Sequence, residues 1–298
     1  MNRLQRQSFL GEGSEATLST ATIGIAGLGG GGSHAAQQFA HMGIGGYIPA
    51  DPQCIDVTNT NRLIGGTLSD VKKGKAKVYI TERLIRGLQP RARIHAVKGS
   101  WQAATELLKQ CDLIIGAVDS FKEREQLERF ARRYLIAYID IGMDVHEIDH
   151  KAFLISGQVI LSMPGCPCLR CCGLLTDERL EGEAKQYGAA GSRPQVVWPN
   201  GVLASTAVGL AAQLLTPWFP RPPEFTYLEY DGNKGTVSVS ARVELLKGSI
   251  CPHHPPDETG DPFFDIREHM KRQGKAGAGP RMRRWRSWLR GLTGRWEP

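Results

Sequence analysis

The 298-residue sequence has no apolar run that approaches the roughly 18 residues a membrane-spanning helix needs. Its first ten residues are polar and lack the hydrophobic segment of a secretory signal peptide. Because neither membrane insertion nor secretion is indicated, we expect a cytoplasmic protein. The hydrophobic content of 41% and the charged content of 22% are ordinary for a soluble enzyme.

Excess charge is absent from most of the chain, although the formal net charge is +7. Residues 267–298 contain ten Lys or Arg and two Glu, so the preceding 266 residues carry a charge of −1. The main body therefore lacks the positive surplus that indicates a nucleic-acid-binding surface. Residues 281–296 interleave six Arg with three Trp, which suits an acidic partner, a membrane surface, nucleic acid or only a solubilising end.

Cysteine spacing suited to disulfides is also absent, because four of the seven cysteines crowd into residues 166–172. Such spacing more often indicates metal or redox chemistry in a cytosolic chain. One C-x-x-C pair is followed much later in the sequence by Cys-Pro-His-His. Together the two segments offer a sulfur-rich set of ligands of the kind that zinc prefers. We expect a structural zinc ion held by Cys168, Cys171, Cys251 and His254. His253 is the alternative fourth ligand, and reactive thiols are the alternative function.

The first 150 residues alternate short apolar segments with helical ones, which predicts a Rossmann-like, doubly wound parallel sheet. Expected strands are 22–26, 46–49, 94–97, 113–118 and 135–139, and expected helices are 33–41, 72–88 and 123–134. From residue 151 the pattern changes to antiparallel strands, with one apolar helix and a long crossover loop. These elements are expected at 153–162 and 225–243 (strands), 201–215 (helix) and 176–199 (loop).

This pattern predicts one α/β domain over residues 1–254. Its nucleotide-binding half spans 1–150, and its second half, 151–254, holds the crossover loop, the zinc site and the antiparallel strands. Residues 255–298 are expected to form a flexible Pro-rich linker and the basic tail.

A glycine-rich turn follows the first expected strand and precedes the first expected helix. Glycines let the backbone approach phosphates closely, and the helix N-terminus offers free N–H groups. The glycines expected to bind a nucleotide are Gly27, Gly29, Gly30 and Gly32. Asp51 ends the next strand about 20 residues later, where a carboxylate usually accepts the ribose hydroxyls. The alternative is a glycine turn without a ligand.

A polar and cationic segment distinguishes this nucleotide site from that of a dehydrogenase. Asn59, Arg62 and Lys75 follow Asp51, and two cations near a nucleotide would neutralise a triphosphate. Asp119 ends the apolar strand at 113–118 and can hold Mg²⁺ between phosphate oxygens. An NAD-dependent oxidoreductase remains an alternative that the cationic pair disfavours.

These motifs, in this order, resemble the ThiF/MoeB/HesA superfamily of adenylyltransferases, relatives of the ubiquitin-activating enzymes, over roughly residues 3–254. The resemblance implies ATP-dependent adenylylation of the C-terminal carboxylate of a ubiquitin-like or sulfur-carrier protein ending in Gly-Gly, with release of pyrophosphate. It also implies a homodimer. The catalytic residues that it implies are Arg62, Lys75, Asp119 and Arg6. Arg6, in an R-x-x-R-Q segment, would act in the neighbouring subunit or, alternatively, is a solvated charge.

The sequence departs from the superfamily pattern in the crossover region, where residues 173–200 contain no cysteine. Only Cys172 and Cys166 remain as candidates for an enzyme thioester, so we expect adenylation without one. Gln53 stands where a second acid is often found, which leaves the detailed nucleotide contacts open. Activation of a small or tRNA-borne carboxylate, as in threonylcarbamoyladenosine dehydratases, and a non-catalytic scaffold are further alternatives.

Overall fold

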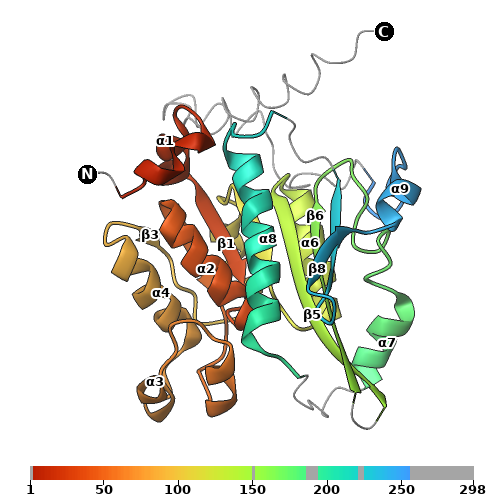
Figure 1. Ribbon diagram of the computed structural model, residues 1–298, viewed down its shortest axis with the longest axis horizontal. Coiled ribbons are helices and arrows are strands. Elements are labelled where there is room, and N and C mark those ends of the chain that lie inside the picture. The colour runs from red at the N-terminus through yellow and green to blue at the C-terminus, as the bar shows by residue number, and fades with distance from the viewer. Residues whose placement is uncertain (1–2, 150–151, 186–193, 221–224, 256–298) are drawn as a thin grey trace. The chain divides into compact units, whose positions relative to one another are not determined.

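An eight-stranded mixed sheet runs through the computed structural model, which describes residues 3–149, 152–185, 194–220 and 225–255 (Figure 1). Its strand order is β3-β2-β1-β4-β5-β6-β7-β8. The first five strands of that order pair in parallel, and β5 to β8 pair antiparallel. The strands are β1 Thr22–Ala26, β2 Gly46–Ala50, β3 Arg93–Ile94, β4 Leu113–Gly116, β5 Ala137–Asp149, β6 Ala152–Ser162, β7 Thr226–Asp231 and β8 Thr236–Val239.

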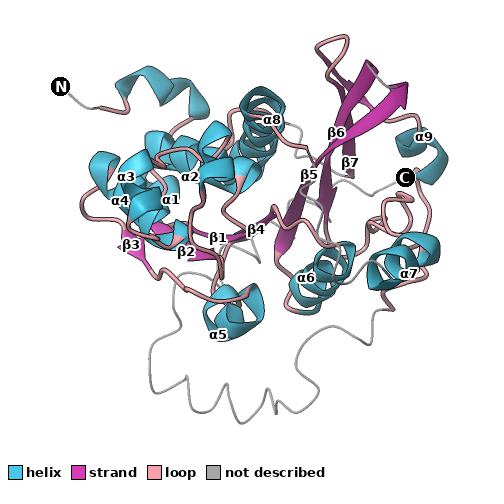
Figure 2. Cartoon of the chain, turned by 90° about the horizontal axis from the view of Figure 1, so that it is seen from below, coloured by secondary structure: helices cyan, strands magenta, loops and turns pink. Residues whose placement is uncertain are grey.

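Helices cover both faces of the parallel part of this sheet. Figure 2 shows α2, α4 and α8 on one face and α5 and α6 on the other. The α-helices are α1 Ser14–Thr20, α2 Gly30–Met42, α3 Leu68–Lys72, α4 Lys77–Leu88, α5 Thr105–Leu108, α6 Phe121–Arg133, α7 Asp177–Lys185, α8 Val197–Leu215 and α9 Arg242–Leu246. Three 3-10 helices are η1 Gln5–Leu10, η2 Val57–Asn61 and η3 Trp101–Ala104. The expected α/β class with an antiparallel extension is confirmed.

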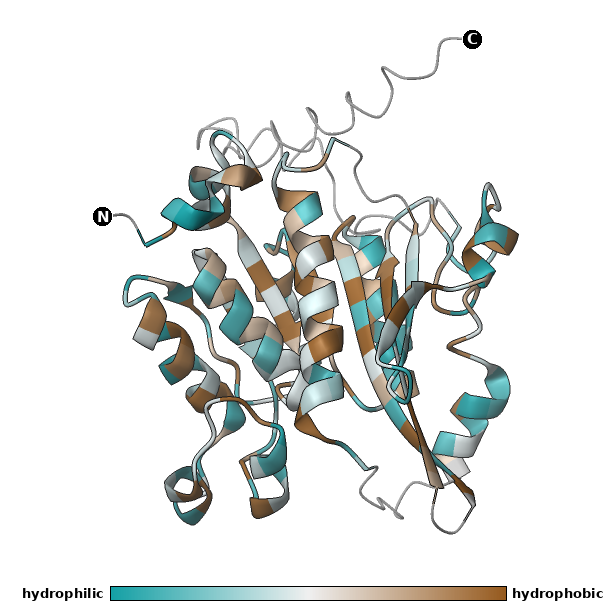
Figure 3. Ribbon diagram, viewed as in Figure 1, coloured by the Kyte–Doolittle hydropathy of each residue, from teal (hydrophilic) through white to brown (hydrophobic). Residues whose placement is uncertain are grey.

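The hydrophobic core lies between the sheet and these helices. Ile23 and Ile25 of β1 are fully buried, and every residue of β4 is buried. Helix α8 packs against α2, and the small residues Ala204 and Ala211 of α8 are fully buried. Figure 3 shows hydrophobic residues along β1 and α8. Within the described part of the chain, no helix is both long and apolar enough to cross a bilayer.

Four expected elements differ from the structure. The helix expected over 72–88 is two helices, because Gly74 adopts φ +55° and the Lys75 N–H donates to the Asp70 carbonyl (3.0 Å), which ends α3. The strands expected within 225–243 form the β7–β8 hairpin and then α9. The crossover expected as a loop begins with α7. In place of a strand over 94–97, β3 is followed by a single bridge at Val97.

Residues 1–259 form one compact unit, which contains all the described residues. The linker and basic tail expected at 255–298 lie almost wholly outside the described residues, as does the middle of the crossover segment, 186–193.

Candidate active site

The glycine-rich turn joins β1 to α2 at the carboxyl end of β1, the edge at which ligands bind in sheets of this type. Gly27 has φ +84°, and a Cβ there would lie 2.4 Å from the carbonyl oxygen of Ala117. A Cβ at Gly32 would lie 1.9 Å from the carbonyl oxygen of Gly27. Both glycines are therefore required by the backbone itself. Gly29 faces open space, because a Cβ at this position would have no atom within 4 Å. An anion can therefore approach the α2 N-terminus there.

Gly30 faces protein instead of open space. A Cβ at Gly30 would meet the side chain of Asn200 at 2.4 Å. Asn200 is buried in the first turn of α8, and its Nδ2 donates to the Val196 carbonyl oxygen (2.8 Å). The start of α8 therefore borders the glycine turn, a contact that the sequence did not indicate.

Asp51 follows β2 and lies beside the glycine turn. It is buried, and its Oδ2 accepts from the Leu28 N–H (2.7 Å) while its Oδ1 accepts from the Gln53 N–H (2.8 Å). Each carboxylate oxygen keeps a lone pair for a further donor. The structure thus gives Asp51 a role in holding the turn, and ribose binding remains a prediction.

Asn59 and Arg62 belong to a compact turn formed by η2. The Asn59 N–H donates to Asp56 Oδ1 (3.1 Å), and Asn59 Oδ1 accepts from the Asp56 N–H (3.3 Å), so the two residues form a capping box. Arg62 is half-buried, and its Nη1 donates to the Thr58 carbonyl oxygen (2.8 Å). The Asn59 side chain is thus used in capping, and the Arg62 guanidinium keeps donors for an anion.

Two lysines lie at the start of α4, and only one was singled out from the sequence. Lys75 precedes the helix, is half-buried, and its ammonium group forms no hydrogen bond or ion pair with the described residues. Lys77 is 5% exposed, and its Nζ donates to Gln53 Oε1 (2.6 Å). Its ammonium group has no ion pair among the described residues, although its charge helps to lower the pKa of the exposed Asp56 carboxyl. A phosphate bound here would compensate the buried charge more closely. The repeated cation in Gly-Lys-Ala-Lys was the available signal.

Asp119 is exposed, and Gln195 forms hydrogen bonds both with it and with the segment that carries Arg62. The sequence did not predict a role for Gln195. Gln195 Nε2 donates to Asp119 Oδ1 (3.3 Å), and the Gln195 carbonyl oxygen accepts from Asn61 Nδ2 (2.8 Å). The end of the crossover segment therefore brings together two candidate regions that lie about 60 residues apart in the sequence.

Four carboxylates gather near the N-terminus of α6. Ser120 caps this helix, and Glu183 of α7 accepts a hydrogen bond from Ser120 Oγ (3.1 Å). Burial raises the pKa of Glu123, and the charges of Glu183, Asp119 and Asp51 raise it further. Carboxylate oxygens that repel one another suit a hard divalent cation such as Mg²⁺. Glu183 is already bonded to the first turn of α6, and these four carboxylates are not close enough to one another to form a ligand set by themselves. Magnesium at Asp119 therefore remains a prediction.

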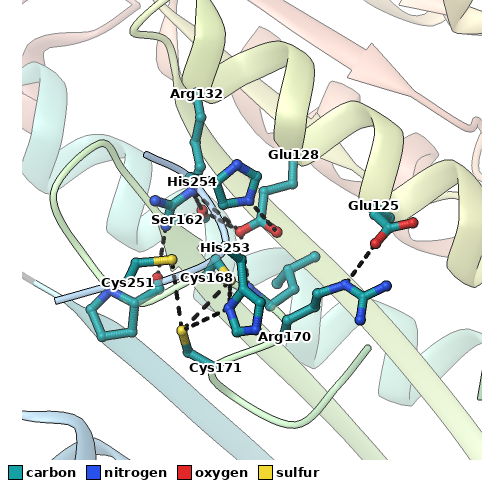
Figure 4. A network of polar contacts seen from close by, with 12 residues as sticks. Glu125, Glu128, Arg132, Ser162, Cys168, Arg170, Cys171, Cys251, His253 and His254 are labelled. Atoms are coloured by element: carbon teal, nitrogen blue, oxygen red, sulfur yellow. Dashed lines mark hydrogen bonds and ion pairs between the residues drawn. The ribbon is translucent and has the colours of Figure 1, made fainter. Parts of the chain in front are cut away.

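A second cluster lies beside α6 and consists of Cys168, Cys171, Cys251 and His253, whose ligand atoms all lie within 4.8 Å of one another (Figure 4). The Sγ of Cys171 is 3.7 Å from those of Cys168 and Cys251, and His253 Nδ1 is 3.4 Å from the Sγ atoms of Cys168 and Cys171. Tetrahedral zinc–sulfur bonds of about 2.3 Å separate the ligands by about 3.8 Å. The geometry therefore fits zinc.

At the fourth ligand position the structure brings His253, the alternative ligand, together with the three cysteines (Figure 4). His254 instead groups with Cys168 and Glu128, with its Nε2 3.8 Å from Glu128 Oε2, so the identity of the zinc ligand remains a prediction. Adjacent residues on an irregular segment project in different directions, so the spacing alone could not choose between them.

Glu128 of α6 supports the loop that carries the first two cysteines. Its Oε1 accepts from the Leu169 N–H (2.9 Å) and from Ser162 Oγ (2.5 Å). Arg132 Nη2, one helical turn along, donates to the carbonyl oxygens of Cys166 (2.9 Å) and Pro167 (2.8 Å). The same helix that begins beside Asp119 therefore holds the cysteine loop. This buried network has no signature in the sequence.

Cys172 lies next to the cluster but is only 1% exposed. Burial, together with the charge of Glu128, raises the pKa of its thiol to about 12. A buried thiol of this kind cannot meet a protein substrate without a rearrangement.

A sequence model of the ThiF family matches residues 2–251. The chain belongs to the ThiF family. Among ThiF-family relatives, the heterocyst HesA protein of Trichormus variabilis is 24% identical over 85% of this chain and 88% of its own length. The tRNA threonylcarbamoyladenosine dehydratase of Bacillus subtilis is 37% identical, over 29% of this chain and a third (33%) of that protein. Its Escherichia coli counterpart is 32% identical, over 47% of this chain and about half (52%) of that protein.

The crystal structure of Escherichia coli MccB with ATP resembles this ThiF-family chain with a TM-score of 0.64. The two are 20% identical, and the match covers 80% of this chain and 71% of that chain. At this identity the likeness shows the fold alone.

Arg6 lies far from the glycine turn of its own ThiF domain. The N-terminal segment is fixed to the C-terminal end of α2, where Arg3 Nη1 donates to the His41 carbonyl oxygen (2.9 Å) and Gln7 Nε2 to that of Met42 (2.8 Å). The glycine turn is at the other end of α2, about 20 Å away for a 13-residue helix. Arg6 is exposed there, so any contact with a nucleotide would be in another copy of the chain.

Proposed function

We propose that this ThiF-family protein uses ATP to adenylylate a carboxylate and releases pyrophosphate. The observation that carries the proposal is the convergence, at one edge of the sheet, of an open helix N-terminus, two lysines without an ion pair among the described residues and an exposed carboxylate. These features are the space at Gly29, the ammonium groups of Lys75 and Lys77, and the exposed carboxylate of Asp119. A dinucleotide-dependent oxidoreductase has no need of this charge arrangement.

The proposed substrate is the C-terminal carboxylate of a ubiquitin-like or sulfur-carrier protein ending in Gly-Gly. Support comes from relatives named as a sulfur carrier protein adenylyltransferase of Thermus thermophilus (28% identical over 57% of this chain and 63% of that protein) and a SAMP-activating enzyme E1 of Haloferax volcanii. MccB has been crystallised with the peptide MccA, which also suits a site that receives the end of a polypeptide.

The residues of the site would act by position and charge more than by covalent chemistry. The amides of the α2 N-terminus, Arg62, Lys75 and Lys77 would hold the phosphates, and Asp51 the ribose. The substrate carboxylate would attack the α-phosphate, giving an acyl-adenylate and pyrophosphate. Magnesium, when bound at Asp119, would neutralise phosphate charge. Burial of Cys172 argues against one of the two thioester candidates, whereas Cys166 is half-buried, and we propose adenylation without a subsequent enzyme thioester.

Two further features complete the proposal. Zinc at the Cys/His cluster would be structural, because four protein ligands leave it no open position. Arg6 would act in the nucleotide site of a second copy, as a homodimer would allow, since it lies at the far end of α2 in its own chain.

A second candidate is activation of a small or tRNA-borne carboxylate. It is favoured by the 37% and 32% identity to threonylcarbamoyladenosine dehydratases, although those matches cover only part of each protein. The same Arg62, Lys75 and Asp119 would serve both reactions, so only the substrate distinguishes them.

ATP–pyrophosphate exchange tests the proposed function. We expect exchange that depends on a carrier protein ending in Gly-Gly and falls by about 100-fold or more in Asp119→Ala, since loss of one charged group at a transition state has effects of this size. Asp231→Ala, which alters an exposed turn after β7, is the matched control and should retain full exchange. Absence of exchange with every carrier, or equal exchange in Asp119→Ala, would refute the proposal. Exchange with threonylcarbamoyladenosine-containing tRNA alone would favour the second candidate.

A further inference from the structure

Helix α7 is attached at its first residue to the cysteine loop and to α6. Arg170 lies between Cys168 and Cys171, and its Nη1 donates to Oδ1 of Asp177, the first residue of α7 (2.8 Å). Its Nε donates to Glu125 Oε1 on α6 (2.7 Å; Figure 4). The Arg170 and Glu125 side chains are 27% and 33% exposed, whereas Asp177 is 80% exposed, so the pair with Glu125 is the firmer of the two.

The other end of α7 is attached to the first turn of α6 by Glu183. Its Oε1 accepts from the Phe121 N–H (3.1 Å), and its Oε2 accepts from the Lys122 N–H (3.0 Å) and from Ser120 Oγ (3.1 Å). A carboxylate bonded to free amides at a helix N-terminus is favoured by charge and by the helix dipole. Ser120 directly follows Asp119, so these bonds fix the backbone that presents the candidate magnesium residue.

Helix α6 runs between the two attachments. Its first turn receives Glu183, Glu125 receives Arg170, and Glu128 holds the backbone of the cysteine loop through the Leu169 N–H. The cysteine loop, α7 and the first turn of α6 therefore form a closed circuit of contacts. A displacement of the cysteine loop would move Arg170 and with it the start of α7.

We propose that α7 is a clasp between the Cys/His cluster and the candidate active site, with Arg170 and Glu183 as positioning residues for Asp119. Metal in the cluster fixes the Cys168–Cys171 loop, Arg170 then holds the start of α7, and Glu183 reaches the first turn of α6. Without the metal, α7 loosens and the backbone at Asp119 is held less firmly. The role assigned to Asp119 rests on the proposed function, but the mechanical link does not.

Hydrogen exchange on the full chain tests the link without reference to activity. Zinc-loaded protein, chelated protein, Arg170→Ala and Glu183→Ala are compared at residues 119–123 and 177–183. We expect faster exchange at 177–183 after chelation and in both variants, and faster exchange at 119–123 in each case. The matched control, Arg86→Ala, removes an exposed Arg–Glu pair of α4 and should change neither segment.

If chelation also speeds exchange in β1, it has caused general unfolding, and the two variants alone then decide between the outcomes. Unchanged exchange at 119–123 in both Arg170→Ala and Glu183→Ala overturns the clasp, whether or not ATP–pyrophosphate exchange occurs. Loosening at 119–123 in a protein without ATP–pyrophosphate exchange upholds the clasp and counts against the proposed function instead.

Activity then separates a positioning role from a merely structural one. In Glu183→Ala we expect the magnesium concentration for half-maximal ATP–pyrophosphate exchange to rise roughly threefold to tenfold, as loss of charge-assisted hydrogen bonds at a half-buried group would give. Glu183→Gln keeps one acceptor oxygen and should recover part of this effect. A fall in rate at every magnesium concentration, with no shift in the half-maximal value, would contradict the positioning role.

Discussion

At the scale of single residues, burial distinguishes two lysines that look alike in the sequence. Lys77 is almost fully buried and bonded to the amide of Gln53, while Lys75 is half-buried and reaches no partner among the described residues. Desolvating an ammonium group is costly unless a negative charge compensates it. A bound phosphate would supply that charge to Lys77 more effectively than to Lys75, because the buried site has the lower dielectric.

Lys77→Met should therefore reduce ATP–pyrophosphate exchange more than Lys75→Met does. Methionine keeps an apolar chain of similar length in the buried position while removing the charge. We expect a loss of about 100-fold or more for Lys77→Met, the size seen when one transition-state donor is removed, and a smaller loss for Lys75→Met. Thermal unfolding of both variants checks that they remain folded. A larger loss of exchange in Lys75→Met than in Lys77→Met would show that Lys75, the lysine predicted from the sequence, is the more important cation.

The positions of several candidate site residues in the fold could be predicted because each occupies a fixed place in a motif. Gly27, Asp51 and Asp119 follow three apolar strands, and the carboxyl ends of those strands meet at one edge of the parallel sheet. Gln195 and Glu183 could not be predicted, because their partners are distant in the sequence and depend on where the crossover segment runs. The choice of His253 over His254 likewise depends on the path of an irregular segment.

At the scale of elements, the break between α3 and α4 shows how caps override periodicity. Apolar spacing over 72–88 is compatible with one helix, but Thr67 and Asp70 form a capping box that begins α3, and Gly74 adopts φ +55° after it. The Thr-x-x-Asp motif can be recognised in the sequence. Its consequence is that Lys75 lies between the two helices and not within one.

Asp70 makes the stability of this element depend on pH. Hydrogen bonds from Arg83, and then from Thr67, hold the pKa of Asp70 well below its usual range. Because the folded pKa is lower than the unfolded value of about 3.9, the contribution to stability is fully present above that pH and is lost as the pH falls below it. Asp70→Asn should lower the free energy of unfolding by about 1–3 kcal/mol at neutral pH.

Chemical denaturation of both proteins across the acid range measures this effect. The difference between wild type and Asp70→Asn should shrink as the pH falls below about 4, because the Asp70 carboxyl then takes up a proton in the unfolded chain but not in the folded one. Glu82→Gln, which alters the exposed ion pair with Arg86, is the control and should change the free energy of unfolding by less than about 1 kcal/mol. A difference that stays constant with pH would show that the Asp70 carboxylate is not the group concerned.

At the scale of the whole described body, the Cys/His cluster joins two segments about 80 residues apart in the sequence. One segment enters the crossover, and the other follows the antiparallel strands and α9. A metal ion that closes so long a loop removes much conformational freedom from the unfolded chain. We therefore expect metal binding at the cluster to stabilise the whole second half, residues 151–254, and not only the cysteine loop.

Metal analysis and thermal unfolding test this role and the choice of ligands together. Wild type should hold about one zinc ion per chain, as one tetrahedral site implies, and Cys168→Ser/Cys171→Ser should hold none. His253→Ala should weaken zinc retention during dialysis against a chelator, whereas the matched variant His254→Ala should retain it, because only His253 lies with the three cysteines. Removal of zinc should lower the melting temperature of wild type. Zinc retained by the double cysteine variant would refute the cluster as a metal site, and zinc retained by His253→Ala but lost by His254→Ala would return the fourth position to His254.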